Sequence, residues 1–196
     1  MPSAESLLEI VKREGITNSR LLHALESTDR ADFVPKGTKP ADAYRDEPIR
    51  IGQGQTTSQP SLIARMIDAL ALKPDDSVLE IGTGLGYQTA LLARVCSRVV
   101  SIERYERLAT LARRNLEAVG IENALVVVED GTKGAPEHAP FNGVIGSAAA
   151  PRIPEPIAKQ LAPEGRVIMP LGPGGQERVQ LYQKQGDVLQ FITTVA

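Results

Sequence analysis

The sequence has few of the residues on which much protein chemistry depends. Its 196 residues include one cysteine, two histidines and no tryptophan. A single cysteine, Cys96, excludes an intramolecular disulfide. The histidines, His23 and His138, stand far apart in unlike contexts, so no zinc site is indicated. Cys96 follows an apolar helical pattern with no histidine nearby, so we expect a buried, unreactive thiol.

Strong net charge and long apolar segments are also lacking. The net charge is −2, which provides no broad basic field for nucleic acid or an anionic membrane. The apolar stretches are of strand length, well short of the roughly 20 residues that span a bilayer. The first ten residues, MPSAESLLEI, have neither the basic nor the apolar region of a secretory signal. We therefore expect a cytoplasmic, monomeric protein that binds neither nucleic acid nor membrane.

The order of hydrophobic patterns predicts an α/β fold. Apolar residues at three- and four-residue spacing indicate helices over 4–14, 19–27 and 61–72. Residues 28–60 have little regular pattern and four prolines, and such a segment in a compact domain is usually functional or disordered. From residue 76 strands alternate with helices: we expect strands at 77–81, 98–103, 124–130, 141–147 and 165–171, and helices at 87–96, 105–119 and 154–161.

The near-continuous apolar strands predict a mostly parallel, doubly wound sheet of Rossmann-like type that is covered on both faces. Two further strands, 177–185 and 187–195, meet at Gly186-Asp187 and predict an antiparallel hairpin at the edge of the sheet. The chain has no internal repeat and no linker, so residues 1–196 are expected to form one domain.

A glycine-rich turn joins the first predicted strand of this region to its helix, in VLEIGTGLGYQTALLA (78–93). Its glycines, Gly82, Gly84 and Gly86, have the spacing G-x-G-x-G, which is not the G-x-G-x-x-G of dinucleotide-binding proteins. No Gly-Lys-Ser/Thr follows, so it is not a P-loop either. Glu80 precedes the turn and would repel a pyrophosphate, whereas it suits a cationic ligand.

Two more acids stand at predicted strand ends. Glu103 ends the second strand, where a carboxylate can bind both hydroxyls of a ribose, and Asp130-Gly131 ends the third, within reach of an adenine edge. S-adenosyl-L-methionine combines a ribose, an adenine and positive charge without phosphate, and is therefore the predicted cofactor. The glycines alone are equally compatible with ordinary turn chemistry.

Several segments resemble the protein-L-isoaspartate (D-aspartate) O-methyltransferase family over nearly the whole chain. They are DRADFVP (29–35), DEPIRIGQGQTTSQPSLIARM (46–66), VLEIGTGLGYQTA (78–90), SIER (101–104), EDGTKG (129–134), AAAPRIPEP (148–156) and LAPEGRVIMPLGPGGQE (161–177). The cofactor turn is common to many methyltransferases, whereas GQTTSQP and AAAP are the specific parts. The resemblance implies a class I methyltransferase domain with an active-site segment within residues 1–60 and an α/β core over 61–196.

The family methylates the α-carboxylate of L-isoaspartyl residues in damaged proteins, and the ester then closes to a succinimide. The resemblance implies that Ser58 is the active-site residue and that the product of the cofactor is S-adenosyl-L-homocysteine. It implies cofactor binding by Glu80, Gly82, Thr83, Gly84, Gly86, Glu103, Arg104, Asp130 and Gly131, and substrate binding by Thr56, Thr57, Gln59 and Ala149, with no metal.

This chemistry suits a chain with so few histidines. A carboxylate with a reference pKa of about 4 is already ionised at neutral pH, so it needs no general base. A serine hydroxyl at position 58 can orient it by donating one hydrogen bond. From the residues alone, turn chemistry or a cap of the following helix is the better explanation of Ser58, and it is the resemblance that favours the active-site role.

Three other functions compete with this hypothesis. A related enzyme could methylate an ordinary aspartate in one dedicated peptide, and a non-catalytic protein could bind S-adenosylmethionine without using it. A nicotinamide-dependent oxidoreductase is disfavoured by the glycine spacing and by Glu80.

Overall fold

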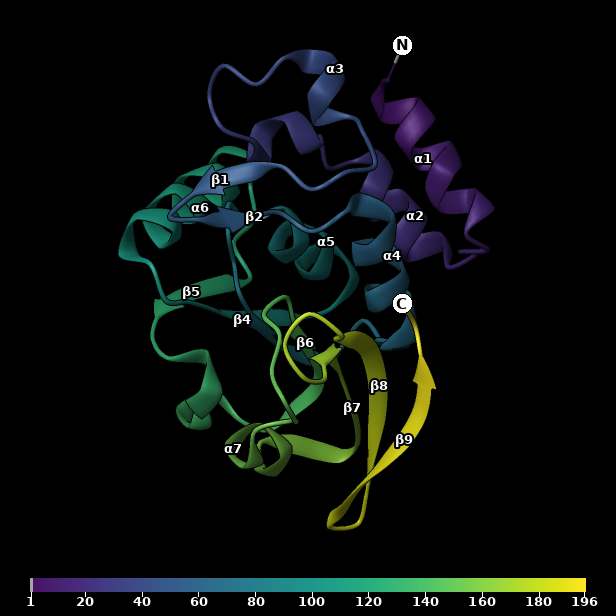
Figure 1. Cartoon of the computed structure of the whole chain (residues 1–196), viewed down its shortest axis with the longest axis vertical. Coiled ribbons are helices and arrows are strands. Elements are labelled where there is room, and N and C mark those ends of the chain that lie inside the picture. Colours follow the sequence, from purple (N-terminus) through teal and green to yellow (C-terminus); the bar gives the residue numbers. More distant parts are fainter. Residues whose placement is uncertain (1) are drawn as a thin grey trace.

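The computed structural model describes residues 2–196 and shows the predicted alternation of strands and helices (Figure 1). No helix in that part of the chain has the length and apolar character needed to cross a membrane. The helices are α1 (Ala4–Arg13), α2 (Ser19–Glu26), α3 (Pro40–Ala43), α4 (Pro60–Ala69), α5 (Tyr87–Val95), α6 (Glu106–Ala118) and α7 (Glu155–Lys159), with 3-10 turns η1 (Arg30–Phe33), η2 (Gly131–Lys133) and η3 (Pro136–His138).

A seven-stranded sheet forms the centre of the molecule, in the order β5-β4-β3-β6-β7-β8-β9. Its strands are β3 (Ser77–Ile81), β4 (Arg98–Glu103), β5 (Ala124–Val128), β6 (Phe141–Gly146), β7 (Leu161–Leu171), β8 (Arg178–Gln185) and β9 (Val188–Thr194). The first five in spatial order are parallel, and β8 is antiparallel to both of its neighbours. The predicted parallel sheet and terminal hairpin are therefore confirmed.

The strand order reverses between β3 and β6, because the chain runs outward from β3 through β4 to β5 and then returns to the other side of β3. Ligands bind outside the carboxyl ends of parallel strands at such a reversal. The topology therefore places a candidate site at the ends of β3 and β6.

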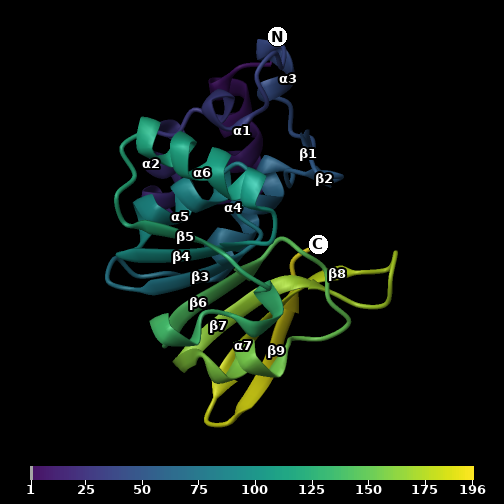
Figure 2. The same cartoon turned by 90° about the vertical axis from the view of Figure 1, so that its left-hand side faces the viewer.

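Helices cover both faces of the sheet, as the sequence predicts, but they cover them unequally. Figure 2 shows α2, α4, α5 and α6 gathered on one side of the sheet, with α7 on the other. The reason lies in the connection from β5 to β6, residues 129–140, which contains only the turns η2 and η3. Ile157 of α7 and Phe141 complete the core on that second face.

The N-terminal helices belong to the main core. Val11 of α1 and Leu21 of α2 are buried in the same apolar cluster as Val78 of β3 and Ile145 of β6. Arg20 of α2 also donates hydrogen bonds of 2.7 and 2.8 Å to the backbone carbonyls of residues 95 and 72. The first helices are thus fixed to the α/β core by both apolar and polar contacts.

Strand β6 contains two interior glycines, which would weaken an ordinary strand. A Cβ atom at Gly143 would lie 2.8 Å from Cδ2 of Leu72, and one at Gly146 would lie 2.9 Å from Cβ of Met169. Close packing against these two side chains explains why the strand has no larger residues there.

Candidate active site

A cavity of about 740 Å³ opens at the carboxyl ends of the central strands. Its walls come from the ends of β3, β4, β5 and β6, from the turns that follow them, and from a small hairpin, β1 (Arg50–Gly52) and β2 (Gln55–Thr56). The hairpin is held over the site by Ile51, which packs with Leu85 and Leu108. The volume is within the range of about 300–1,000 Å³ that is usual for sites of nucleotide-sized ligands.

The glycine turn lets backbone form one wall of this cavity. Gly82 and Gly84 have φ values of +97° and +59°, which residues with a side chain rarely adopt. A Cβ atom at these positions would also lie 3.2 Å from Cβ of Ser147 and from Cδ1 of Ile51, respectively. A ligand can therefore approach the main chain closely at this turn.

Glu103 is fixed at the end of β4 with its carboxylate in the cavity wall. Its two oxygens accept hydrogen bonds from the backbone N–H groups of Gly84, at 2.9 Å, and Tyr105, at 3.0 Å. A carboxylate oxygen has more than one lone pair, so Glu103 can still accept from the hydroxyls of a ribose.

Asp130 follows β5 in the opposite wall. The backbone N–H and the hydroxyl of Thr132 donate to its Oδ1 at 3.0 and 2.8 Å, and these bonds hold the pKa of Asp130 below its usual value. The apolar residues Ile102, Leu108 and Val128 also line the cavity. The cavity therefore offers one carboxylate for the hydroxyls of a ribose, a second for the amino edge of an adenine, and apolar walls for its ring. This combination fits an adenosine.

Glu80 lies beneath the turn and has no exposed surface. Its carboxylate accepts hydrogen bonds from Gln88 Nε2 at 2.9 Å, from Ser101 Oγ at 2.6 Å and from the hydroxyl of Thr89. Burial raises the pKa of Glu80 to about 7, although the three hydrogen bonds oppose that shift. Glu80 therefore has no surface with which to contact a ligand directly.

Ser58 lines a second, smaller hollow of about 50 Å³. This hollow shares Ile51, Thr56, Gly82, Gly84 and Ser147 with the large cavity, so the two adjoin. Ser58 is half-buried, and its hydroxyl has no hydrogen-bond partner within residues 2–196. The hydroxyl is thus directed by no other protein group and can serve a ligand.

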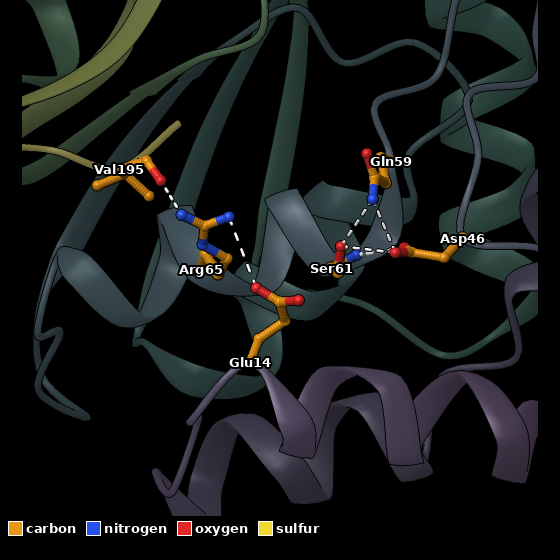
Figure 3. A network of polar contacts seen from close by, with 6 residues as sticks. All are labelled: Glu14, Asp46, Gln59, Ser61, Arg65 and Val195. Atoms are coloured by element: carbon orange, nitrogen blue, oxygen red, sulfur yellow. Dashed lines mark hydrogen bonds and ion pairs between the residues drawn. The ribbon is translucent and has the colours of Figure 1, made fainter.

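Asp46, not Ser58, caps the helix that follows the active-site segment. Helix α4 has Gln59 at its N-cap without a side-chain cap bond. The Asp46 carboxylate instead accepts from the backbone N–H of Ser61 at 2.8 Å, from its hydroxyl at 2.7 Å and from Gln59 Nε2 at 2.7 Å (Figure 3). This contact settles the alternative explanation of Ser58, because the capping role is filled from 15 residues upstream.

Arg30 fixes the same segment from the other side. Its buried guanidinium, on η1, donates to the backbone carbonyls of Ala43, Arg45 and Glu47 at 2.6–3.0 Å. It also donates to the hydroxyl of Thr57 at 3.2 Å, next to Ser58. The segment 28–60, which was expected to be irregular, contains before α4 only the short elements η1, α3, β1 and β2, and a charged side chain ties its backbone together.

The structure brings most of the predicted site residues together. Those in the wall of the large cavity are Thr56, Gly82, Gly84, Glu103, Arg104, Asp130, Gly131 and Ala149. Thr57, Ser58 and Thr83 line the small hollow instead. Glu80, Gly86 and Gln59 line neither cavity: Glu80 is buried, Gly86 is the N-cap of α5, and Gln59 bonds to Asp46.

Sequence reasoning missed several residues of these walls. Gln55, Tyr105, Leu108 and Ser147 line the large cavity, and Gln88 lines the small hollow. Tyr105 directly follows the predicted acidic strand end, which is a signal that could have found it. Gln88 stands within an ordinary helical pattern and gives no such signal.

The one cysteine has the burial that the sequence predicts. Cys96 is buried, and burial raises the pKa of its thiol to about 12, so it is an unreactive thiol. Within the described part of the chain, no group of three or more His, Cys, Asp or Glu side chains could hold a metal ion.

The sheet, its reversal point and a cavity lined by Glu103, Asp130 and apolar side chains are those of a class I S-adenosylmethionine-dependent methyltransferase. The model of the Protein-L-isoaspartate(D-aspartate) O-methyltransferase (PCMT) family matches residues 2–196. The chain belongs to that family.

Individual relatives agree with this assignment. Protein-L-isoaspartate O-methyltransferases of Roseiflexus castenholzii and Methanoculleus marisnigri are 43% and 44% identical to the chain, each over 94% of it and 84% of the relative. That of Myxococcus xanthus is 44% identical over 93% of this chain and 87% of the relative.

Two solved structures share the fold. A protein-L-isoaspartate O-methyltransferase with 30% identity matches 98% of this chain with a TM-score of 0.87, and this chain spans 64% of that protein. A Plasmodium falciparum structure described as an enzyme of this family, solved with S-adenosyl-L-homocysteine, matches the whole chain with a TM-score of 0.83 at 23% identity.

Proposed function

We propose that this chain transfers the methyl group of S-adenosyl-L-methionine to the α-carboxylate of L-isoaspartyl residues in damaged proteins and peptides. Methyl esterification starts repair, because the ester closes to a succinimide that hydrolyses in part to normal aspartyl. The observation that carries the proposal is the free Ser58 hydroxyl in a hollow that opens into the cofactor cavity. Membership in the family supplies the substrate class.

The cofactor site is assigned to groups whose chemistry fits each part of the ligand. Glu103 would hold the ribose hydroxyls, and Asp130 with Gly131 would hold the adenine edge. The backbone at Gly82 and Gly84 would lie against the methionyl part. The bound cofactor supplies an electrophilic methyl group on a sulfonium, and S-adenosyl-L-homocysteine is the product.

The protein's part in the reaction is alignment. The substrate carboxylate is already ionised at neutral pH, so no base has to remove a proton. Ser58 donates its hydroxyl to one carboxylate oxygen and keeps its own proton. Thr56 and Thr57 line the same hollow, and the small side chain of Ala149, in the wall of the large cavity, would leave room for a peptide backbone. Holding reactants in such a geometry can lower a barrier by several kcal/mol.

The substrate is tested with three synthetic peptides that differ at one position, which is Asp, D-Asp or L-isoAsp. Labelled S-adenosylmethionine should place a base-labile methyl group on the L-isoAsp peptide. Transfer to the L-Asp peptide would instead support a biosynthetic aspartate methyltransferase. Cofactor binding without any transfer would support a non-catalytic binding protein.

Ser58→Ala tests the assigned residue. Loss of one hydrogen bond to a charged group should lower kcat/KM for the L-isoAsp peptide by roughly 10- to 100-fold. The affinity for S-adenosylhomocysteine, measured by calorimetry, should stay within about twofold. Thr193→Ala, on exposed β9, is the matched control and should change neither quantity. Turnover of Ser58→Ala at the wild-type rate would remove Ser58 from the mechanism.

The proposal also places the enzyme in the cytoplasm as a monomer whose partners are isoaspartyl proteins and peptides. The net charge of −2, which offers no field for nucleic acid or anionic lipid, supports only the choice of protein and peptide partners.

A further inference from the structure

A third hollow, the side hollow, lies on the face of the sheet that α7 covers. Its volume is about 300 Å³, far more than the roughly 30 Å³ that one water occupies in the liquid. Its apolar walls are Pro151, Ile153, Leu171, Tyr182 and Leu189. Ile153, Tyr182 and Leu189 are only half-buried, so the hollow offers apolar surface that no other part of the described chain covers.

One segment of backbone borders both the side hollow and the large cavity. Residues 147–149 line the large cavity, and residues 151–153 line the side hollow. Figure 1 shows this segment running from β6 to α7. Ala150, between the two sets, donates its N–H to the carbonyl of Pro170 at 3.1 Å and accepts at its carbonyl from the N–H of Gly172 at 3.1 Å. The shared wall is therefore fixed to the end of β7 and formed before any ligand arrives.

The spacing along this wall suits an extended peptide. Ala149 and Pro151 are two residues apart, which is at most about 7 Å. An extended chain advances about 3.3 Å per residue. A peptide whose backbone passes Ala149 in the large cavity can therefore reach the side hollow with a side chain roughly two to four residues from the one that reacts.

The polar groups of the side hollow determine which side chain fits. Gln180 already accepts a hydrogen bond from the hydroxyl of Tyr182 at 2.9 Å. Arg152 is exposed and is the one charged residue of the described chain in the wall. Glu155, three residues further on, is paired with Lys159 at 2.6 Å. The positive charge of Arg152 would repel a lysine or arginine side chain of a peptide.

The apolar walls decide between the remaining side chains. A carboxylate entering the side hollow would exchange water for apolar contacts on most sides, which is costly. A large apolar side chain would instead remove its own surface and that of Ile153 and Leu189 from water, which is favourable.

We infer that the side hollow binds a large apolar side chain of the substrate peptide, two to four residues from the isoaspartyl residue, and that Arg152 excludes basic side chains from it. The inference rests on the proposed function, because it assigns a flanking residue of the same peptide substrate. It makes Leu189 and Arg152 specificity-determining residues.

A leucine scan tests the inference. Peptides with one L-isoAsp residue in a Gly-Ser background carry a single Leu at each of the four positions on either side. Their affinities are measured by calorimetry with saturating S-adenosylhomocysteine, so the result does not require turnover. Leu should bind roughly tenfold more tightly than Ser at a position two to four residues away on one side. Lys at that position should bind more weakly than Ser.

Two variants locate the effect. Leu189→Trp fills the side hollow and should reduce the preference for Leu over Ser to within about twofold. Val188→Trp is the matched control, because Val188 is exposed on the same strand and lies outside the wall, and it should keep the preference. Arg152→Gln, at an exposed position that folding does not require, should keep the preference for Leu and remove the disadvantage of Lys.

Three results would overturn the inference. Equal affinities at every scanned position would show that the side hollow receives no substrate side chain. A preference for Leu that persists in Leu189→Trp would place its subsite elsewhere. A dimer of wild-type protein in sedimentation that Leu189→Trp dissolves, with an unchanged leucine profile, would make the side hollow an interface between copies. Peptides that show the preference without being methylated would contradict the proposed methyl transfer alone, and peptides methylated without a preference would contradict this inference alone.

Discussion

At the scale of single residues, Glu80 shows how burial in a core can raise the pKa of a carboxyl group into the neutral pH range. Burial raises its pKa to about 7, whereas the unfolded chain has the ordinary value of 4.5. The folded protein therefore binds this proton more tightly than the unfolded protein. The contribution of Glu80 to stability is fully present below about pH 4.5 and is lost as the pH rises through about 7.

Glu80→Gln should remove this pH dependence. From pH 4.5 to pH 8, the free energy of unfolding of wild-type protein should fall relative to that of Glu80→Gln by roughly 3 kcal/mol, the energy of a shift of this size. Other carboxylates titrate alike in both proteins, so the difference isolates Glu80. Urea denaturation at a series of pH values, followed by circular dichroism, measures it. If the difference in free energy of unfolding between the two proteins did not change with pH, the pKa of Glu80 would not be raised in the folded state.

At the scale of elements, the segment between α2 and α4 depends on Arg30. The guanidinium bonds to three backbone carbonyls and to Thr57, and their loss would leave buried acceptors without donors. Arg30→Met should lower the free energy of unfolding by roughly 2–4 kcal/mol. It should also speed hydrogen exchange over residues 43–58 and lower kcat/KM more than it weakens S-adenosylhomocysteine binding.

Arg107→Met is the matched control, because Arg107 lies exposed on α6. It should leave stability, exchange and kinetics near wild-type values. If Arg30→Met showed wild-type exchange over residues 43–58, the segment would be ordered by contacts other than the guanidinium.

The same elements show what a sequence can and cannot predict. Strands and helices after residue 76 were predictable because their periodicity is local, and the acids Glu103 and Asp130 were predictable because strand ends meet at one edge. The roles of Asp46 and Arg30 were not predictable, because Asp46 bonds to Ser61, 15 positions away, and Arg30 bonds to Thr57, 27 positions away. Gln88 escaped for the same reason, because only the fold brings its side chain to Glu80 and to the hollow that Ser58 also lines.

Position along the strands also separates the two acids that the sequence places near strand ends. Glu80 and Glu103 both occupy strand ends before a turn, yet only Glu103 reaches the cavity. The register pairs Glu80 with Ser101, two residues before Glu103, so both acids point to the same face and Glu103 lies nearer the carboxyl edge of the sheet. Ser101 and Thr89 supply the partners that the buried Glu80 carboxylate needs.

At the scale of the whole molecule, the chain should unfold as one unit. The division into an N-terminal part, residues 1–60, and a core, residues 61–196, follows function rather than packing. Val11 and Leu21 share a core cluster with β3, β6 and β8, and Arg65 of α4 bonds to the backbone carbonyl of Val195 and pairs with Glu14 at 3.6 Å (Figure 3). The two parts of the chain therefore stabilise one another.

Scanning calorimetry should accordingly show a single transition with equal calorimetric and van't Hoff enthalpies. S-adenosylhomocysteine at about 100 times its Kd should add roughly 2.7 kcal/mol and raise the melting temperature without splitting the peak. The midpoint should not change with protein concentration if the chain is a monomer, even though Phe191 and Ile192 are exposed on the edge strand β9. A separate early transition would show that residues 1–60 form an independent unit. A midpoint that rises with concentration would show that a second copy covers β9.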